Sequence, residues 1–239
     1  MKLTYKELEI ELELAGLLAV EELVLTQGLN CHAGLTLKIL IEEEQRDELV
    51  TMSSDAGVTV RELEKTNGQV VFRGKLETVS ARRENGLFYL YLEAWSYTMD
   101  WDRVKKSRSF QNGALTYMEV AQRVLSGYGQ SGVTDHATGG ACIPEFLLQY
   151  EESDWVFLRR LASHFGTYLL ADATDACGKV YFGIPEIYYG TVLDRQDYTM
   201  EKDMLHYARV LEKEGVLSQE ASCWNVMVRF FLRMGETLT

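Results

Sequence analysis

A strict alternation of charged and apolar residues near the N-terminus constrains the fold more than any other feature. In residues 7–14, Glu alternates with Leu or Ile at every second position. Successive side chains of a β-strand point to opposite faces, so this segment predicts a strand with one acidic and one buried apolar face. Residues 35–42 and 58–61 show a similar pattern. We therefore expect antiparallel β structure with one face in a core.

A hairpin is predicted for residues 69–81 and 87–97. The two segments are rich in β-branched and aromatic residues, and the connection between them ends in Asn85-Gly86. Asn-Gly is a strong short-range signal for a hairpin turn. We interpret residues 1–100 as a small β-barrel or curled sheet.

The pattern changes near residue 100. Thr116 and Glu119 have the spacing of a capping box, and apolar residues then recur at helical intervals up to residue 128. Gly127 or Gly129 is expected to end this helix. Residues 130–140 show no periodicity and predict a loop between the two halves of the chain.

A strand followed by a capped helix is predicted next. Residues 146–150 indicate a short strand, Ser153 is the expected N-cap, and Asp154 in the first turn favours the helix dipole. The expected apolar stripe, which must bury against a sheet, is Trp155, Leu158, Leu161, Ala162 and Phe165, and Gly166 ends the helix. Further strands are predicted at residues 167–171, 179–183, 204–212 and 224–233, with a loop at 172–178.

Composition excludes several classes of protein. The 239 residues are 46% hydrophobic, which suits a globular chain with a real core, and the formal net charge of −12 disfavours tight binding of nucleic acid or anionic membranes. The longest apolar run is far too short to cross a bilayer, and no secretory signal opens the sequence, so we expect synthesis in the cytoplasm. The cysteines Cys31, Cys142, Cys177 and Cys223 lie far apart and are expected to be reduced, mostly buried thiols.

Motifs that could carry chemistry have simpler explanations. The G-x-G-x-x-G match at residues 127–132 follows a predicted helix and opens none, which favours a helix end and loop over a nucleotide site. The histidines lack the ligand spacing of a zinc site: Cys31 and His32 are adjacent, and His164 is expected to be a partly exposed helix residue.

The acidic cluster Glu151, Glu152 and Asp154 could be the paired carboxylates of a glycosidase, but a helix cap explains all three. No G-x-S-x-G elbow, P-loop or H-E-x-x-H motif is present. We predict no catalytic residue, cofactor or metal.

Two segments carry a family resemblance. Residues 149–161, followed by Gly166-Thr167-Tyr168, resemble the Q-Y-x-E-S-D-x-x-F-L-x-R-L signature of contractile-tail hub proteins. This family includes phage late control gene D proteins, baseplate hubs and the VgrG spike of type VI secretion. Upstream, residues 108–112 resemble its R-x-F-Q-N segment, and residues 95–101 lie where its first domain usually ends. The matching residues, which we interpret as structural, are Gln149, Tyr150, Glu152, Ser153, Asp154, Trp155, Phe157, Leu158, Arg160, Leu161, Gly166, Arg108, Phe110 and Gln111. Tyr150 is expected to pack beside the start of the helix.

The resemblance implies a mainly β (α+β) fold and an assembly. Such hubs resemble trimers in which two related β-barrel tube domains per chain alternate around a pseudo-hexameric ring, adapting the hexameric tail tube to the trimeric spike. By analogy, residues 1–100 are the first barrel, 101–145 a helical linker or intervening segment, and 146–239 a second barrel with an insertion near 184–215. Such hubs often continue into a spike, whereas this sequence stops where another strand is expected. We therefore expect either a separate spike polypeptide or a truncated sequence.

The resulting expectation is a non-enzymatic hub subunit of a phage tail, phage-tail-like bacteriocin, extracellular injection system or type VI machine. Its implied partners are further copies of itself in a homotrimer, the tail tube protein, a spike protein or spike domain, and other baseplate proteins. The acidic face Glu7, Glu9, Glu11 and Glu13 is a candidate for a channel wall, although a solvated strand face explains it better. Two alternatives remain: a tail-associated cell-wall hydrolase module, and an unrelated small-ligand-binding β-barrel.

Overall fold

The computed structural model describes residues 2–12, 14, 16–44, 55–63, 68–144 and 146–185, together with four short strands nearer the C-terminus. The chain divides into two units, Met1–Ile184 and Pro185–Thr239. In the part of the chain that is described, no helix is both long and apolar enough to cross a membrane.

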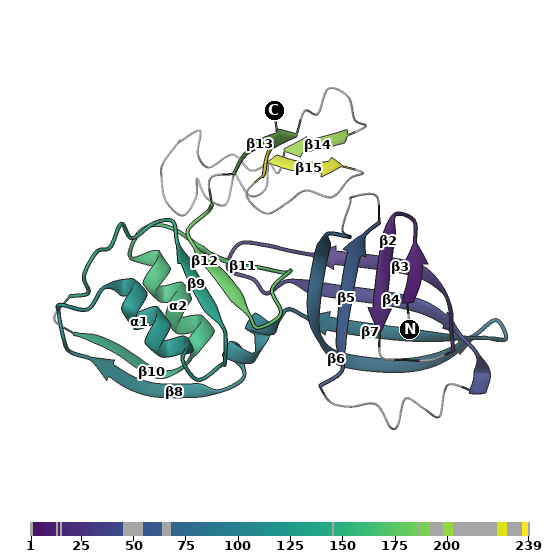
Figure 1. Cartoon of the computed structure of the whole chain (residues 1–239), viewed down its shortest axis with the longest axis horizontal. Coiled ribbons are helices and arrows are strands. Elements are labelled where there is room, and N and C mark those ends of the chain that lie inside the picture. Colours follow the sequence, from purple (N-terminus) through teal and green to yellow (C-terminus); the bar gives the residue numbers. More distant parts are fainter. Residues whose placement is uncertain are drawn as a thin grey trace. The chain divides into compact units, whose positions relative to one another are not determined.

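A seven-stranded antiparallel sheet forms the N-terminal part of the first unit (Figure 1). Its strands follow the order β1-β2-β5-β6-β7-β4-β3. The two end strands, β1 and β3, lie in contact, so the sheet is almost closed. We call this sheet the barrel. Its strands are β1 (Lys2–Tyr5), β2 (Leu8–Leu12), β3 (Leu17–Thr26), β4 (Gly34–Ile41), β5 (Gly57–Glu62), β6 (Val70–Glu84) and β7 (Leu87–Trp95).

The alternation of apolar and polar side chains along the strands produces the buried face of the barrel, as predicted. In β2, Leu8, Ile10 and Leu12 are buried, whereas Glu11 is exposed. The predicted strands at residues 35–42 and 58–61 are confirmed as β4 and β5. The predicted hairpin is also confirmed: Asn85 and Gly86 both take positive φ values, as a tight hairpin turn requires.

One glycine of the barrel permits a close approach of two strands. A Cβ added to Gly74 in β6 would lie 2.3 Å from the carbonyl oxygen of Trp95 in β7, far inside van der Waals contact. The two backbones therefore approach where no side chain fits. A bulge between Leu76 and Thr78 follows directly.

The rest of the first unit, residues 97–183, forms a second body that we call the helical lobe. Its elements are η2 (Tyr97–Asp102), β8 (Lys105–Phe110), α1 (Tyr117–Leu125), β9 (Gly132–Asp135), β10 (Leu147–Ser153), α2 (Asp154–Ser163), β11 (Leu169–Ala171) and β12 (Lys179–Phe182). Strands β8 and β10 form an antiparallel ribbon, and β9, β12 and β11 form a second small sheet. The two helices lie between these strands (Figure 1).

Both predicted helices are confirmed with their caps. Thr116 and Glu119 form the complete capping box of α1, and Gly129 takes a positive φ just beyond its end. Strands β11 and β12 also lie where the sequence predicts them. The prediction of a continuous loop over residues 130–140 is wrong, because β9 begins at Gly132 and pairs in parallel with β12. A four-residue strand is too short to show a period, and its partner lies more than 40 residues away.

The ribbon of β8 and β10 joins segments on both sides of residue 145. Phe110 of β8 pairs with Leu147 of β10, and both side chains enter the same core as α1 and α2. The proposed division into residues 1–100, 101–145 and 146–239 stays a prediction, because much of residues 185–239 lies outside the described part.

The second unit contains two strand pairs. β13 (Ile187–Thr191) runs parallel to β16 (Glu236–Leu238), and β14 (Tyr198–Lys202) runs antiparallel to β15 (Trp224–Val228). The strand predicted at residues 224–233 is therefore confirmed over its first five residues. The strand predicted at 204–212, most of the predicted insertion, and Cys223 lie outside the described residues.

The prediction of mostly buried thiols is wrong for two of the described cysteines. Cys31 and Cys142 are exposed, and Cys177 is partly buried. All three lie outside the strands and helices, where the chain runs over the surface.

Candidate functional site

The signature residues gather around the start of α2. Ser153 is the N-cap, as predicted, and its Oγ accepts a hydrogen bond from the backbone N–H of Val156 at 3.1 Å. The same hydroxyl donates to the carboxylate of Asp102 in η2. The cap therefore ties the helix start to the segment that leaves the barrel.

Asp154 is the centre of a buried polar network. Its side chain is fully buried, and four donors surround it. Gln149 Nε2 donates to Oδ1 at 2.9 Å, and the Arg108 guanidinium also binds Oδ1. Lys106 Nζ and the Tyr128 hydroxyl donate to Oδ2, each at 2.7 Å. The donors therefore come from β8, from β10 and from the turn after α1.

The network sets the charge state of Asp154. Burial raises the pKa of this carboxyl, but the hydrogen bonds from Gln149, Lys106 and Tyr128 and the charge of Arg108 outweigh burial, so the pKa lies below its ordinary value. Asp154 is therefore a buried carboxylate with its charge balanced. Asp154 lies in the first turn of α2, as predicted, but its hydrogen-bond partners lie on other elements.

Gln149 holds an irregularity in β10. Its amide also donates to the backbone carbonyl of Glu152 at 3.1 Å, across a bulge between these two residues. Within the bulge, Glu151 takes a φ of +48°, which is unusual for a residue with a side chain. Tyr150 lies on the same face of β10 as the exposed Leu148, opposite the buried Leu147 and Gln149. Tyr150 is 66% exposed, so the prediction that it packs beside the helix start is wrong.

Glu152 and Arg160 connect α2 back to β10. Arg160 Nη2 lies 2.5 Å from Glu152 Oε1 and 2.5 Å from the carbonyl oxygen of Leu148. The three carboxylates at residues 151–154 therefore do not form one helix cap. Asp154 anchors the network, Glu152 holds Arg160, and Glu151 is exposed in the bulge.

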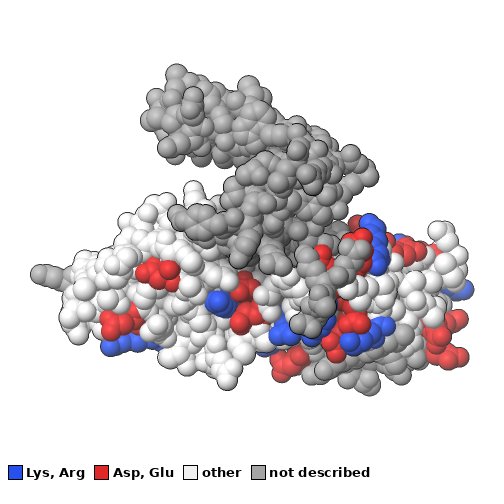
Figure 2. All heavy atoms as spheres, turned by 45° about the horizontal axis from the view of Figure 1, so that its top comes forward, with Lys and Arg blue, Asp and Glu red and all other residues white. Residues whose placement is uncertain are grey.

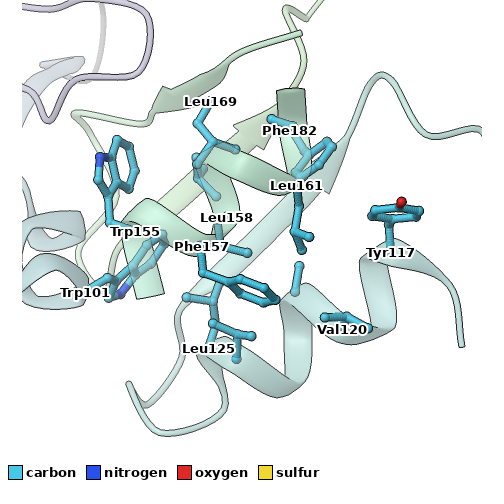
Figure 3. Packing of buried hydrophobic residues seen from close by; sticks show 14 of the residues in the cluster. Trp101, Tyr117, Val120, Leu125, Trp155, Phe157, Leu158, Leu161, Leu169 and Phe182 are labelled. Carbon is cyan, nitrogen blue, oxygen red and sulfur yellow. The ribbon is translucent and has the colours of Figure 1, made fainter. Parts of the chain in front are cut away.

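The apolar signature residues form the core of the helical lobe (Figure 3). In the predicted stripe, Trp155, Leu158, Leu161 and Ala162 are at most 1% exposed, as predicted, whereas Phe165 is partly buried. Phe157, outside that stripe, is also fully buried. Phe110 stacks on Phe157, with ring centroids 5.9 Å apart. The two remaining signature residues lie at the surface: Gln111 is exposed, and Gly166 takes a φ of +61° in the turn that ends α2, as predicted.

His32 lies where the barrel meets the helical lobe. Its ring is 4.1 Å from the ring of Trp155, its Nδ1 is 2.9 Å from Thr98 Oγ1, and its Nε2 is 3.7 Å from Asp102 Oδ2. Nearby, Asn30 exchanges two hydrogen bonds with the backbone of Leu169, at 2.8 and 2.9 Å. The loop between β3 and β4 is thus bound to both α2 and β11. We call this contact the joint.

Several residues of this site have no role in the sequence-based predictions, namely Lys106, Asp102 and Asn30. Tyr128 is predicted only as the last apolar position of the first helix, and His32 only as a possible metal ligand. Lys106 and Arg108 are two residues apart on β8, so their side chains share a face of the strand. This spacing is the one sequence feature that indicates a shared acidic partner. Among the described residues, no group of three or more His, Cys, Asp and Glu side chains could hold a metal ion.

The joint makes stability depend on pH through His32. Burial lowers the pKa of His32 below 6.5, Arg159 acts in the same direction, and Asp102 opposes them. The unfolded chain therefore binds a proton at a higher pH than the folded chain. The stabilisation of the folded chain by a neutral His32 is present above about pH 6.5 and is lost as the pH falls below that value.

We expect the substitution His32→Gln to reduce the change in the free energy of unfolding between pH 8 and pH 5, by on the order of 1 kcal/mol. The measurement is urea unfolding at both pH values. His136→Gln, which replaces an exposed histidine, is the control and should leave the dependence unchanged. If both variants follow the parent chain, the titration of His32 does not act on the joint.

A comparison with protein families decides the assignment. The model of the phage tail baseplate hub (GPD) matches residues 35–183, which include both resembling segments and the whole helical lobe. The chain belongs to the phage tail baseplate hub family. The resemblance drawn from residues 108–112 and 149–168 is thereby confirmed. No curated protein sequence matches this hub family member.

Solved structures of tail proteins share the fold. A 43 kDa tail protein of prophage MuSo2 from Shewanella oneidensis has a TM-score of 0.60 at 14% identity, covering 83% of this chain and 61% of that protein. The E. coli c3393 protein, a component of the type VI secretion system, has a TM-score of 0.60 at 13% identity, covering 94% and 64%. A tail protein of Neisseria meningitidis has a TM-score of 0.51 at 14% identity, covering 87% and 62%. This hub chain therefore spans less than two thirds of each of these proteins, and the mainly β fold with a barrel-like sheet is confirmed.

Proposed function

We propose that this chain is a structural subunit of the hub of a contractile injection apparatus, where it adapts a hexameric tail tube to a trimeric spike. The observation that carries the proposal is the family match over residues 35–183. A homotrimer in which two related modules per chain alternate would supply the six positions that a hexameric tube requires. In that arrangement, residues 1–100 and 146–239 are the two modules and 101–145 connects them.

The geometry of the signature supports a structural role. A glycosidase needs two carboxyl groups that flank the substrate and exchange protons with it. Here Asp154 is buried under four donors, and Glu152 is held by Arg160. The polar side chains Gln149, Asp154, Glu152, Arg160 and Arg108 hold α2, β8 and β10 together, and Ser153 adds a bond to η2. We therefore propose that the chain has no enzymatic activity of its own and needs no cofactor or metal.

The proposed partners are further copies of this chain, the tube protein, the spike and other baseplate proteins. Figure 2 shows acidic and basic side chains intermixed on the visible face, with no single large basic patch. A phosphate backbone requires clustered positive charge, so this face supports the proposal that the chain does not bind nucleic acid tightly. The protein would be made in the bacterial cytoplasm and incorporated into the particle without inserting into a membrane.

A deletion experiment tests the hub function. The coding sequence is removed from a bacterium that produces the particles, and lysates are viewed by negative-stain electron microscopy. We expect no complete tails, and we expect a plasmid copy to restore them. Complete sheathed tails in the absence of the chain would contradict the proposal. Digestion of cell-wall substrate by the purified chain would instead favour the hydrolase alternative.

A further inference from the structure

The barrel ends in a long strand edge. β3 is the last strand of the sheet and, among the described strands, pairs only with β4. It has ten residues, whereas β1, which lies against it, has four. More than half of the outer edge of β3 is therefore beyond the reach of β1. Unpaired backbone groups along a strand edge are a template for pairing with another strand.

The helical lobe has a second edge, on β8. This six-residue strand pairs only with β10 among the described strands and lies at the margin of the lobe (Figure 1). The outer edge of β10 is partly blocked, because Arg160 binds the carbonyl oxygen of Leu148. With that carbonyl bound by Arg160, we assign Leu148 and its partner Ser109 as a non-hydrogen-bonded pair. The N–H and C=O of Ser109 then face the outer edge of β8.

The two edges carry opposite charges. β3 contains Glu21, which lies 3.1 Å from Lys38, and Glu22, and it has no basic residue. β8 contains three basic residues and no acidic one, but Lys106 and Arg108 bind Asp154, so Lys105 carries the charge that is left for a partner. Glu22 and Lys105 are both exposed, and neither has an ion-pair partner in the described part of the chain. Apolar side chains accompany both edges: Leu18 on β3 is 51% exposed, and Val104 beside β8 is 57% exposed.

We propose that the edge of β8 in one copy of this chain pairs with the edge of β3 in the next copy. The proposal rests on the proposed function for the presence of several copies, and it names the surfaces through which they associate. The contact joins different surfaces of the two copies, so its repetition generates a ring when the rotation closes. Pairing of two identical edges is disfavoured, because it would bring two Glu22 carboxylates or two Lys105 ammonium groups together.

Charge reversal tests the pairing. Sedimentation velocity measures self-association of the 239-residue chain and of its variants over a range of concentrations. We expect Lys105→Glu and Glu22→Lys each to weaken association about tenfold or more, and the double variant to restore it. Arg123→Glu makes the same charge change on an exposed residue of α1 and should leave association unchanged. Added salt should weaken association of the parent chain.

A second variant tests the backbone pairing itself. Ser109→Pro removes the N–H that faces the outer edge without removing a hydrogen bond to β10. We expect this variant to keep its far-ultraviolet circular dichroism spectrum and to lose association. A chain that stays monomeric at every concentration, or that associates equally well in all of these variants, would overturn the proposal. Either result would leave the hub function standing, because the deletion experiment measures it separately.

Discussion

The substitution Asp154→Ala is expected to lower the free energy of unfolding by about 3 kcal/mol. Removing one partner of a buried ion pair typically costs 3–5 kcal/mol, since the remaining charge is left without compensation. We take the lower end of that range because Lys106 and Arg108 keep 36% and 28% of their side chains exposed and can turn to water. Gln149, in contrast, is fully buried and would lose a hydrogen-bond acceptor.

Urea unfolding at neutral pH measures this effect, and its pH dependence identifies the cause. Because the folded-state pKa of Asp154 is lowered, its contribution is present above the unfolded value of 3.8 and is lost as the pH falls through the folded value. The difference between the parent chain and Asp154→Ala should therefore shrink in strong acid. Glu93→Ala, at an exposed position of the barrel, is the control. A loss below 1 kcal/mol at neutral pH would show that the network contributes little.

The substitution Trp155→Ala is expected to cost roughly 3 to 5 kcal/mol, which is typical of removing a large buried aromatic side chain. Trp155 is 1% exposed and lies between the core of the helical lobe and the ring of His32. Its loss would leave a cavity in the lobe and remove a contact of the joint. For a chain of this size, the melting temperature should fall by roughly 10 °C.

The neighbouring substitution Val156→Ala provides the matched control for Trp155→Ala. Val156 is 40% exposed on the same helix turn, so its truncation should change stability by no more than about 0.5 kcal/mol. Equal melting temperatures for the two variants would mean that α2 does not dock through Trp155.

Features encoded by nearby residues could be predicted from the sequence. The alternation in β2, the Asn85-Gly86 turn and the capping box at Thr116 each act within a few residues, and each is confirmed. Ser153 was likewise recognised as an N-cap from its immediate context. These signals were sufficient for the barrel-like sheet and for both helices.

Features that depend on distant partners could not be predicted. β9 exists because β12 lies beside it, and Asp154 is a network centre because Lys106 and Tyr128 reach it from other elements. Tyr150 is a different case, because the local pattern contains the answer. The period of two holds from Leu147 to Tyr150 and places Tyr150 with Leu148 on the exposed face of β10.

Electron cryo-microscopy of the assembled particle tests the central claim most directly. We predict three copies of this chain at the end of the tail tube, arranged as a ring of six similar modules, with the barrel and the helical lobe fitting the density. A particle in which this position is filled by another protein, or in which the chain occurs in a number that does not match a trimer, would contradict the account.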